Sequence, residues 1–265
     1  MRYPKLVCFL SDFGQDSIYV SQVKGAILKI CPQARILDLT HNIGPQQIIE
    51  ASFLLKNAYS FFPEGCVFLC VIDPGVGTSR KIIFAQTLKY FFIAPDNGLL
   101  YETLKIQKIV KIISVENSRY FLKDVSSTFH GRDIFAPVVA HFLNLKNIDV
   151  FGKKISFKDL KGLNIPQPVI GPHAIEAKIL HIDRFGNLVT NLCRRDFLRF
   201  MKNRRFVGYL RGRKITRYCT HYAPEEKRPF FIIGSFSALE VSLSRGSAAS
   251  YFGARIQDTL RIKLI

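Results

Sequence analysis

Polar residues follow three apolar segments in the N-terminal half of the chain, each at the point where the segment ends. The first motif is Ser11-Asp12-Phe13-Gly14, the second runs from Asp73 to Arg80, and the third is Pro95-Asp96-Asn97-Gly98. Open α/β sheets bind ligands outside the carboxyl ends of their strands, so three such motifs on one edge predict a ligand site. Because Asp and Gly are also ordinary turn residues, coincidental turn chemistry is the alternative for each motif.

The second motif carries the most chemical information. Asp73 follows an apolar run, and the Pro-Gly-Val-Gly loop behind it lets backbone approach a ligand before the chain reaches Arg80. The loop is not a Walker A phosphate-binding loop, because no Gly-Lys-Ser/Thr follows it. Asp73 and Arg80 therefore belong either to a catalytic site or to a structural ion pair.

A histidine that precedes a predicted helix is a further candidate. His130 lies between Phe129 and Gly131, where its ring can reach into a cleft. A lone histidine at such a position is more often a hydrogen-bonding loop residue than a catalyst. His130 becomes a catalytic candidate only if the fold brings it to Asp73 and Arg80.

The C-terminal part of the sequence offers two polar clusters. Asp183-Arg184-Phe185-Gly186-Asn187 follows a strand, and its carboxylate and amide groups suit a base edge or an amino-acid head group. A β-hairpin turn is the alternative interpretation, since Asp, Gly and Asn are expected there. The second cluster combines Ser235 and Glu240 with the small residues of 245–249, whose backbone groups could contact a flat ring.

Apolar runs, some of them uninterrupted, predict the strands that must position these residues. A run without polar alternation is typical of a strand buried on both faces of a sheet. Strands separated by helical patterns then predict an α/β sheet that is covered by helices on both faces. The predicted strands are residues 6–10, 35–39, 67–72, 81–85 and 90–94.

Capping residues and prolines predict where the helices begin and end. Asp16 or Ser17 can cap a helix that ends before Pro32. Pro45 suits the first position of the next helix. Pro137 is tolerated in a later helix only if it falls in the first turn.

A proline-rich break divides the chain near residues 164–168. Beyond it the apolar pattern changes to a period of two, with Ile175, Ala177 and Ile179 alternating with other residues. We therefore expect two domains, an α/β domain over residues 1–165 and a domain over residues 166–265. The second is expected to be a small β-barrel or sandwich.

Composition and charge limit the class of protein. The chain has 265 residues, 48% of them hydrophobic, and no apolar stretch long enough to span a bilayer. Its six cysteines lack zinc spacing, and we expect reduced thiols in a cytoplasmic protein with no metal site. The net charge of +18 is partly concentrated in residues 203–217. This favours either contact with nucleic acid or a solvated basic surface, and we expect no nucleic-acid ligand.

The motifs taken together resemble a known family. Their order along nearly the whole chain is similar to that of the S-adenosylmethionine hydroxide adenosyltransferases, water-using relatives of the fluorinase and chlorinase. The resemblance implies an N-terminal α/β domain, a C-terminal β-barrel and a homotrimer with active sites between subunits. It implies hydrolysis of S-adenosylmethionine to adenosine and methionine, with no cofactor. The segments that carry the resemblance are residues 11–14, 72–80, 95–100, 128–133, 183–187 with 190–191, and 239–240 with 246–249.

The resemblance also implies a role for individual residues. The counterparts of Asp73, Arg80 and His130 handle the attacking water, and Asp12 matches the carboxylate that holds the ribose hydroxyls. The other implied substrate contacts are Phe129 and Phe185 around the nucleoside, Asp183, Ser235 and Glu240 around the methionine portion, Asn187 on the adenine or amino-acid side, and Ala248 through its backbone to adenine.

Departures from the halogenases indicate water rather than halide as the nucleophile. The halogenases carry Tyr at the position of Asp73 and Tyr-Ser at His130-Gly131, so the serine that helps bind halide is missing. Phe236 stands where the fluorinase has the arginine that binds the methionine carboxylate. A halide-using enzyme, a basic nucleic-acid-binding protein and a nucleoside-binding regulator that has lost catalysis are the alternatives.

Overall fold

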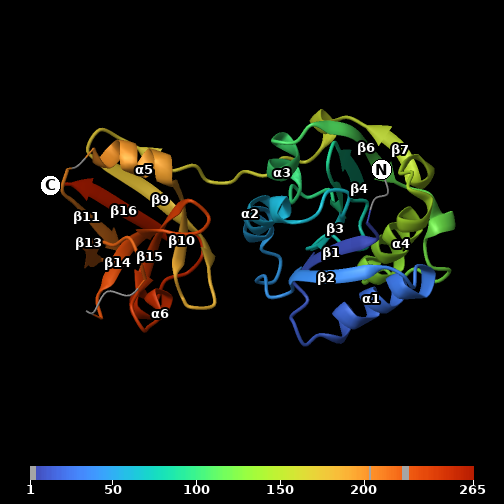
Figure 1. The fold of residues 1–265 in the computed structure, drawn as a ribbon, viewed down its shortest axis with the longest axis horizontal. Helices are drawn as coiled ribbons and strands as arrows, with labels where there is room; N and C mark the ends of the chain where they lie inside the picture. The colour runs from blue at the N-terminus through green and yellow to red at the C-terminus, as the bar shows by residue number, and fades with distance from the viewer. Residues whose placement is uncertain (1–3, 203, 223–226) are drawn as a thin grey trace. The chain divides into compact units, whose positions relative to one another are not determined.

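The chain folds into two compact units. The computed structural model describes residues 4–202, 204–222 and 227–265, and the units are Met1–Leu163 and Asn164–Ile265. Figure 1 shows a mixed α/β unit at the N-terminal end of the colour scale and a mainly β unit at the other. Asn203, at the start of the basic stretch noted in the sequence, lies outside the described residues.

The N-terminal unit is built on a seven-stranded sheet. Its first four strands in spatial order are parallel to one another, and each later pair of neighbours, from the fourth strand on, is antiparallel. The carboxyl ends of the parallel strands therefore lie at one edge. The spatial order is β2 (Arg35–Thr40), β1 (Leu6–Ser11), β3 (Val67–Val71), β5 (Phe91–Pro95), β4 (Ile82–Thr87), β6 (Ile109–Val115) and β7 (Gly152–Ile155).

Helices pack on both faces of this sheet, which confirms the predicted fold class. On β1, Val7 and Phe9 face one apolar core with α1 (Ile18–Ile30) and α4 (Ala136–Leu145). Leu6, Cys8 and Leu10 face the other core with α2 (Ile48–Ala58) and α3 (Tyr101–Lys105). Successive side chains of a strand point to opposite faces, so an uninterrupted apolar run serves both cores.

Two of the three predicted helix features hold, and one is wrong. The Ser17 hydroxyl accepts a hydrogen bond from the Tyr19 amide and caps α1, and Pro137 lies in the first turn of α4. Pro45 is not the first residue of a helix. Gln46 adopts a left-handed conformation with φ of 63°, so the helical conformation cannot begin until α2 starts at Ile48.

The C-terminal unit is a nine-stranded, mainly antiparallel sheet with a barrel-like curl. Its end strand β12 comes close to β14, and a Cβ on Gly208 of β11 would lie 2.3 Å from the Phe231 ring of β14. The spatial order is β12 (Arg213–Ile215), β11 (Phe206–Leu210), β16 (Thr259–Leu264), β9 (Ala174–Ile182), β10 (Leu188–Cys193), β15 (Ala238–Leu243), β14 (Pro229–Ile233) and β13 (Arg217–Tyr218), with β8 (Val169–Ile170) beside β9.

Short helices complete both units. In the C-terminal unit, α5 (Arg194–Met201) buries Phe197 and Phe200 against the barrel core, and α6 (Ala248–Phe252) follows β15. A π-helical turn (Gly131–Phe135) precedes α4. Single 3₁₀ turns occur at Tyr59–Phe61, Ser118–Tyr120, Asp149–Phe151 and Phe157–Asp159.

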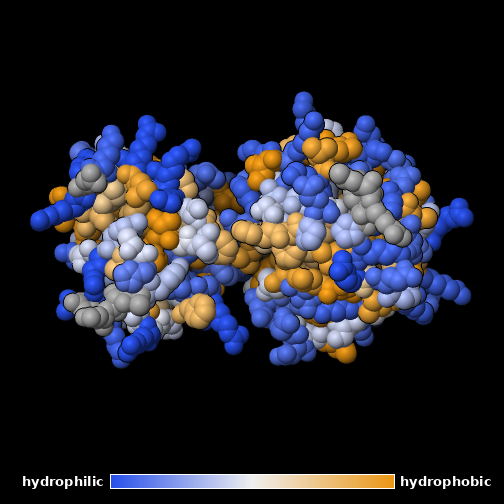
Figure 2. Space-filling view, in the orientation of Figure 1, coloured by the Kyte–Doolittle hydropathy of each residue, from blue (hydrophilic) through white to orange (hydrophobic). Residues whose placement is uncertain are grey.

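The surface mixes hydrophilic and hydrophobic residues. On the visible face of each unit, hydrophilic side chains project at the edges and hydrophobic patches lie between them (Figure 2). No helix among the described residues is long and apolar enough to cross a membrane.

Candidate active site

Asp73, Arg80 and His130 meet in the N-terminal unit. The Arg80 Nε atom donates to both carboxylate oxygens of Asp73, at 2.9 and 3.0 Å, and its Nη2 atom also contacts Asp73 Oδ2. The same Nη2 atom lies 2.8 Å from His130 Nδ1. The Asp73 and Arg80 side chains are each only 7% exposed. The condition that the sequence set for His130, contact with this ion pair, is therefore met.

The direction of the Arg80–His130 hydrogen bond determines the state of the imidazole. A guanidinium can only donate, so His130 Nδ1 accepts and the neutral ring carries its proton on Nε2. Burial lowers the pKa of His130 below its usual value of 6.5, and the positive charge of Arg80 lowers it further. The cluster therefore holds a carboxylate, a guanidinium and a neutral imidazole that can donate from Nε2.

Close backbone packing explains why these residues converge. The loop after β3 turns at Gly77, which has φ of 78°, and a Cβ there would lie 2.2 Å from the Ser127 carbonyl oxygen. Only glycine permits this approach between the Asp73–Arg80 loop and the segment before His130. The π-helical turn then begins at Gly131 directly after His130, and such turns are frequent at functional sites.

A cavity adjoins the cluster at the carboxyl edge of the sheet. Its volume is about 210 Å³, and its wall includes Asp12, Asp73, Phe129 and His130. The four sequence candidates come from three separate segments that the sheet brings together. Asp12 Oδ2 accepts a hydrogen bond of 2.8 Å from the Gln46 amide, so one carboxylate oxygen is fixed to the loop before α2.

The Asp96 and Asn97 side chains of the third strand-end motif bond to backbone groups and do not line this cavity. Asp96 is buried and its Oδ1 atom accepts from the Lys161 amide at 2.9 Å, while Asn97 donates to the Ile72 carbonyl at 2.8 Å. These contacts brace the strand end that precedes Asp73. Long-range structural contacts are thus a sufficient explanation for these two side chains.

Asp183 organises a second cavity, in the C-terminal unit. Its Oδ1 atom accepts from the amides of Phe185 and Asn187 at 2.9 and 2.8 Å, and its Oδ2 atom accepts from the Asn187 side chain at 2.8 Å. The cavity has a volume of about 690 Å³ and is lined by Asp183, Phe185, Asn187, Tyr222, Ser235, Leu243, Arg245 and Gly246. Phe185 is 77% exposed, so its ring is available to a ligand.

Glu240 contacts Tyr222, a residue of the cavity lining. It is 2% exposed, and its Oε2 atom accepts a hydrogen bond of 2.8 Å from the Tyr222 hydroxyl. Burial raises the pKa of Glu240, and the neighbouring charge of Asp183 acts in the same direction. A Cβ on Gly234 would lie 1.7 Å from Glu240 Oε1, so glycine leaves room for the carboxyl group.

Ala248 is placed differently from the other C-terminal candidates. It is buried in the first turn of α6, and the neighbouring Ala249 amide donates to the Gly186 carbonyl at 2.9 Å. This bond joins the helix to the Asp183 turn.

Sequence reasoning missed Tyr222 as a site residue, and it named Arg245 only as a member of the 245–249 cluster. Tyr222 lies between two strands with no motif around it, and only its contact with Glu240 marks it. Arg245 was visible beside the small residues of 245–249, but its position on the cavity wall comes from the fold.

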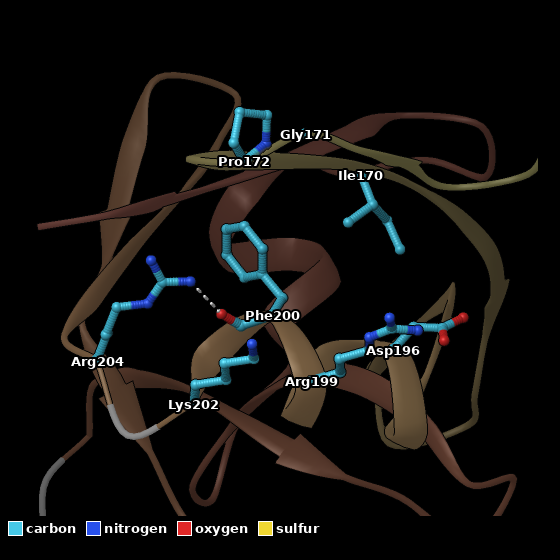
Figure 3. Close-up of a pocket in the computed structure, with 8 residues that line it drawn as sticks. All are labelled: Ile170, Gly171, Pro172, Asp196, Arg199, Phe200, Lys202 and Arg204. Carbon is cyan, nitrogen blue, oxygen red and sulfur yellow. Dashed lines mark hydrogen bonds between the residues drawn. The ribbon is translucent and has the colours of Figure 1, made fainter.

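Another cavity in the C-terminal unit is basic and contains none of the predicted site residues. Figure 3 shows it between the Ile170–Pro172 segment and the end of α5. Arg199, Lys202 and Arg204 line it together with a single acidic residue, Asp196. Arg204 donates to the Phe200 carbonyl at 2.9 Å (Figure 3).

Within the three described ranges of the chain, no group of three or more His, Cys, Asp or Glu side chains is arranged to hold a metal ion.

The fold and the Asp73–Arg80–His130 cluster define a class of protein: a two-unit α/β and β-barrel chain with a charged cavity at the carboxyl edge of its sheet. Residues 7–152 match the SAM hydroxide adenosyltransferase N-terminal domain, and residues 177–261 match the C-terminal domain of the same family. The chain therefore belongs to the S-adenosylmethionine (SAM) hydroxide adenosyltransferase family.

Individual relatives agree with this assignment. The "(R)-S-adenosyl-L-methionine hydrolase" of Thermus thermophilus is 33% identical, over 98% of this chain and 99% of its own length. A fluorinase from Actinoplanes sp. is 27% identical over 72% of each chain. A crystal structure of a protein from Thermotoga maritima has a TM-score of 0.88 and 32% identity, covering 97% of this chain and 99% of the other.

Proposed function

We propose that this protein hydrolyses S-adenosylmethionine to adenosine and methionine. The observation that carries the proposal is the placement of Arg80 between Asp73 and His130 beside a cavity that also contains Asp12. The hydrolase name of the Thermus thermophilus relative, which matches nearly the whole chain, supports the same reaction.

The proposed reaction is a direct displacement by water. The water oxygen attacks C5′ of the nucleoside, the C5′–S bond breaks with its electron pair going to sulfur, and the water proton passes to Asp73. The leaving group is the neutral thioether of methionine, so the step lacks only a good nucleophile. Excluding bulk water favours it, because a developing hydroxide and a sulfonium lose their charges together.

The three cluster residues divide this task. Asp73 orients the water and accepts its proton, a role typically worth about 10²–10⁴-fold in rate. Arg80 offsets the negative charge of Asp73 and fixes the His130 ring. His130 donates from Nε2 to the attacking water oxygen, which develops negative charge as its proton passes to Asp73. Positioning the water in line with the C5′–S bond supplies much of the remainder.

Substrate binding is assigned to residues of both units. We propose that Asp12 binds the ribose hydroxyls and that Phe129 and Phe185 pack around the nucleoside. Asn187 and the backbone at Ala248 contact the adenine side, and Asp183, Ser235 and Glu240 surround the methionine portion. The 210 Å³ cavity of the N-terminal unit is smaller than the roughly 300–1,000 Å³ of most ligand pockets, which supports a site completed by other residues.

We further propose a homotrimer in which the α/β unit of one subunit and the β unit of the next complete each site.

The thiols of Cys8 and Cys66 lie 3.9 Å apart and are unbridged. Such thiols suit a reducing compartment, and we propose a cytoplasmic location.

The competing function is halide transfer, as in the fluorinases. Gly131 offers no hydroxyl where the halogenases carry the halide-binding serine, and Asp73 places a negative charge beside the nucleophile position. The Asp73 carboxylate can accept a proton from attacking water, whereas a halide has no proton to give.

One experiment tests the proposal directly. The purified protein is incubated with S-adenosylmethionine in ¹⁸O-labelled water that contains chloride, and the products are identified by mass spectrometry. We expect methionine without label and adenosine with ¹⁸O at its 5′ oxygen. A 5′-chloro nucleoside, or labelled methionine with unlabelled adenosine, contradicts the proposal.

A further inference from the structure

A chain of polar side chains lies beneath the loop that carries Asp12. Ser11 and His41 are both 0% exposed, and Ser11 Oγ lies 2.7 Å from His41 Nδ1. On the other side of the ring, His41 Nε2 lies 3.1 Å from Asp38 Oδ1. Asp38 Oδ2 in turn lies 2.6 Å from Lys24 Nζ on α1. This network of polar side chains thus links α1, β2 and the end of β1.

Donor and acceptor chemistry sets the direction of the polar contacts in this network of side chains. Asp38 as a carboxylate can only accept, and Lys24 donates to it. The 3.1 Å separation between Asp38 Oδ1 and His41 Nε2 favours the tautomer of His41 that carries its proton on Nε2, facing the carboxylate. His41 Nδ1 then accepts from the Ser11 hydroxyl. The Ser11 oxygen remains free to accept from the Phe13 amide, which lies 3.4 Å away. The His41–Asp38 contact, with 3.1 Å between Nε2 and Oδ1, is an electrostatic contact of poorer hydrogen-bond geometry than the Ser11–His41 and Lys24–Asp38 bonds.

The ordering of Ser, His and Asp resembles a nucleophilic triad, but the burial rules that out. A serine nucleophile must reach its substrate, and neither the Ser11 hydroxyl nor the His41 ring is exposed to solvent. These residues can act only through what they hold in place.

What they hold is the loop on either side of Asp12. The Ser11 oxygen contacts the Phe13 amide, the His41 carbonyl accepts from the Gly14 amide at 2.8 Å, and the Asn42 side chain accepts from the Gln15 amide at 3.1 Å. The His41 ring also packs edge-on against Phe9, with centroids 4.7 Å apart. Asp12 therefore sits between backbone positions that are each tied to the His41 segment.

We propose that His41, together with Ser11 and Asp38, is a positioning group for Asp12. It fixes the Asp12 carboxylate in the geometry that recognises a vicinal diol, the 2′,3′-hydroxyl pair of a nucleoside. The inference rests on the proposed function, because it takes the diol-bearing substrate from there.

The test compares a ligand that has the diol with one that lacks it. Binding of adenosine and of 2′,3′-dideoxyadenosine is measured by calorimetry on the wild type, His41→Phe, Asp12→Ala and the double variant. Phenylalanine keeps the ring against Phe9 and removes both polar contacts. We expect His41→Phe to weaken adenosine binding by about 10-fold or more, the scale of a lost hydrogen bond to a charged group, and to leave dideoxyadenosine binding unchanged.

The double variant separates positioning from general damage. If His41 acts through Asp12, His41→Phe has no further effect on adenosine binding once Asp12 is alanine. His141→Phe is the matched control, since it removes an imidazole of α4 that packs against Tyr120 and does not line the cavity. We expect this control to bind both ligands as the wild type does.

A less disruptive variant covers the case in which His41→Phe does not fold. Ser11→Ala removes only the hydroxyl, and we expect a smaller loss of the same diol preference. Equal weakening of both ligands in either folded variant, or no weakening, overturns the inference, as does a failure of the wild type to prefer adenosine. If the diol preference behaves as expected but S-adenosylmethionine is not cleaved, the proposed function fails while the inference stands.

Discussion

At the scale of single residues, the candidate site is defined by Arg80, which hydrogen-bonds to both Asp73 and His130. Its guanidinium holds both oxygens of Asp73 and also donates to His130, so it fixes the positions of both side chains and the tautomer of the imidazole. A structural ion pair would need only the first of these contacts. The additional bond to a histidine on the cavity wall favours a catalytic role.

Replacing members of the cluster separates catalysis from binding. We expect Asp73→Asn, Arg80→Ala and His130→Ala each to lower kcat more than they raise KM. Combined replacements should reduce kcat by less than the product of the single effects, because residues that act as a unit fail together. Asp12→Ala is the comparison variant and should mainly raise KM. Steady-state kinetics and melting temperatures are measured on all four single variants.

The alternative predicts the opposite pattern. If Asp73 and Arg80 form only a structural pair, Asp73→Asn lowers the melting temperature and leaves kcat of the folded fraction normal. Normal kcat in folded Asp73→Asn and His130→Ala rules out the water-activating role.

The protonation state of His130 predicts a pH dependence. Burial and the charge of Arg80 lower the pKa of His130 below 6.5, so the ring is neutral at neutral pH. Protonation at lower pH removes the acceptor for Arg80 and places two positive charges together. We therefore expect kcat to stay level between neutral pH and pH 6.5 and to fall only below that value.

The Arg80→Gln variant tests the cause of this pH dependence. Removing the positive charge should raise the pKa of His130, which NMR titration of the imidazole measures directly. An unchanged pKa in Arg80→Gln, or a wild-type value above 6.5, contradicts the expectation.

At the scale of elements, the site depends on two loops that pack backbone to backbone. The strand-end loop containing Gly77 lies against Ser127, in the segment that leads into the π-helical turn after His130. This packing ties the position of the loop that carries Arg80 to that of the segment before His130. The parallel strands β1 and β3 supply the rigid edge from which Asp12 and Asp73 extend.

Gly77 and Gly212 offer a matched pair of substitutions. Both have φ of 78°, but a Cβ on Gly77 would lie 2.2 Å from Ser127 O, whereas a Cβ on Gly212 would meet nothing within 4 Å. We expect Gly212→Ala to destabilise the protein by about 1 kcal/mol through backbone strain alone. Gly77→Ala should destabilise it by a further 1–3 kcal/mol or so, as overpacking does, and should also lower kcat.

Chemical denaturation and kinetics on both variants provide the measurement. Equal stability losses in the two variants would show that the loop contact with Ser127 contributes nothing.

At the scale of the whole molecule, charge and cavities are distributed unequally between the two units. Residues 164–265 contain 18 Lys and Arg against 7 Asp and Glu, so most of the net charge of +18 lies in the smaller unit. That unit also contains a cavity lined by Asp183, Asn187 and Ser235, which are residues assigned to the substrate. Each unit therefore presents part of the proposed binding chemistry.

The proposed trimer has a direct test. Light scattering at the concentration used for kinetics should give a mass close to three times 30.2 kDa. A monomer with full activity at that concentration would contradict a site shared between subunits.

The basic hairpin should be separable from turnover. Arg211 lies in the turn that joins β11 to β12 and contacts Asp258 at 3.2 Å. Arg213 and Lys214 are the first residues of β12, and Arg213 lies over the Tyr251 ring. Replacing all three with glutamine should leave kcat nearly unchanged. Any nucleic-acid binding should be independent of sequence and fall steeply with salt, with a smaller salt dependence in the variant.

A large loss of turnover in this triple variant would place the hairpin at the active site. Titration of a labelled oligonucleotide at several salt concentrations, alongside kinetics, distinguishes the outcomes.

The sequence by itself determined the local elements and the candidates. Apolar runs without polar alternation identified β1 and β3 as strands buried on both faces, and Asp16 or Ser17 marked the start of α1. These features depend on residues a few positions apart, whose conformational preferences act within one element. The ordered motifs identified the family, and with it the roles expected of Asp12, Asp73 and His130.

The tertiary structure decided which of these residues meet. His130 is 50 positions from Arg80, and Ser11 is 30 from His41, so nothing in their spacing predicts contact. The prediction that Pro45 begins a helix was wrong because Gln46, whose amide donates to Asp12, adopts a left-handed conformation, and α2 begins only after it. Tyr222 carried no signal until the barrel brought it to Glu240. Such contacts depend on how strands and loops close over long chain separations, and only the folded chain specifies that closure.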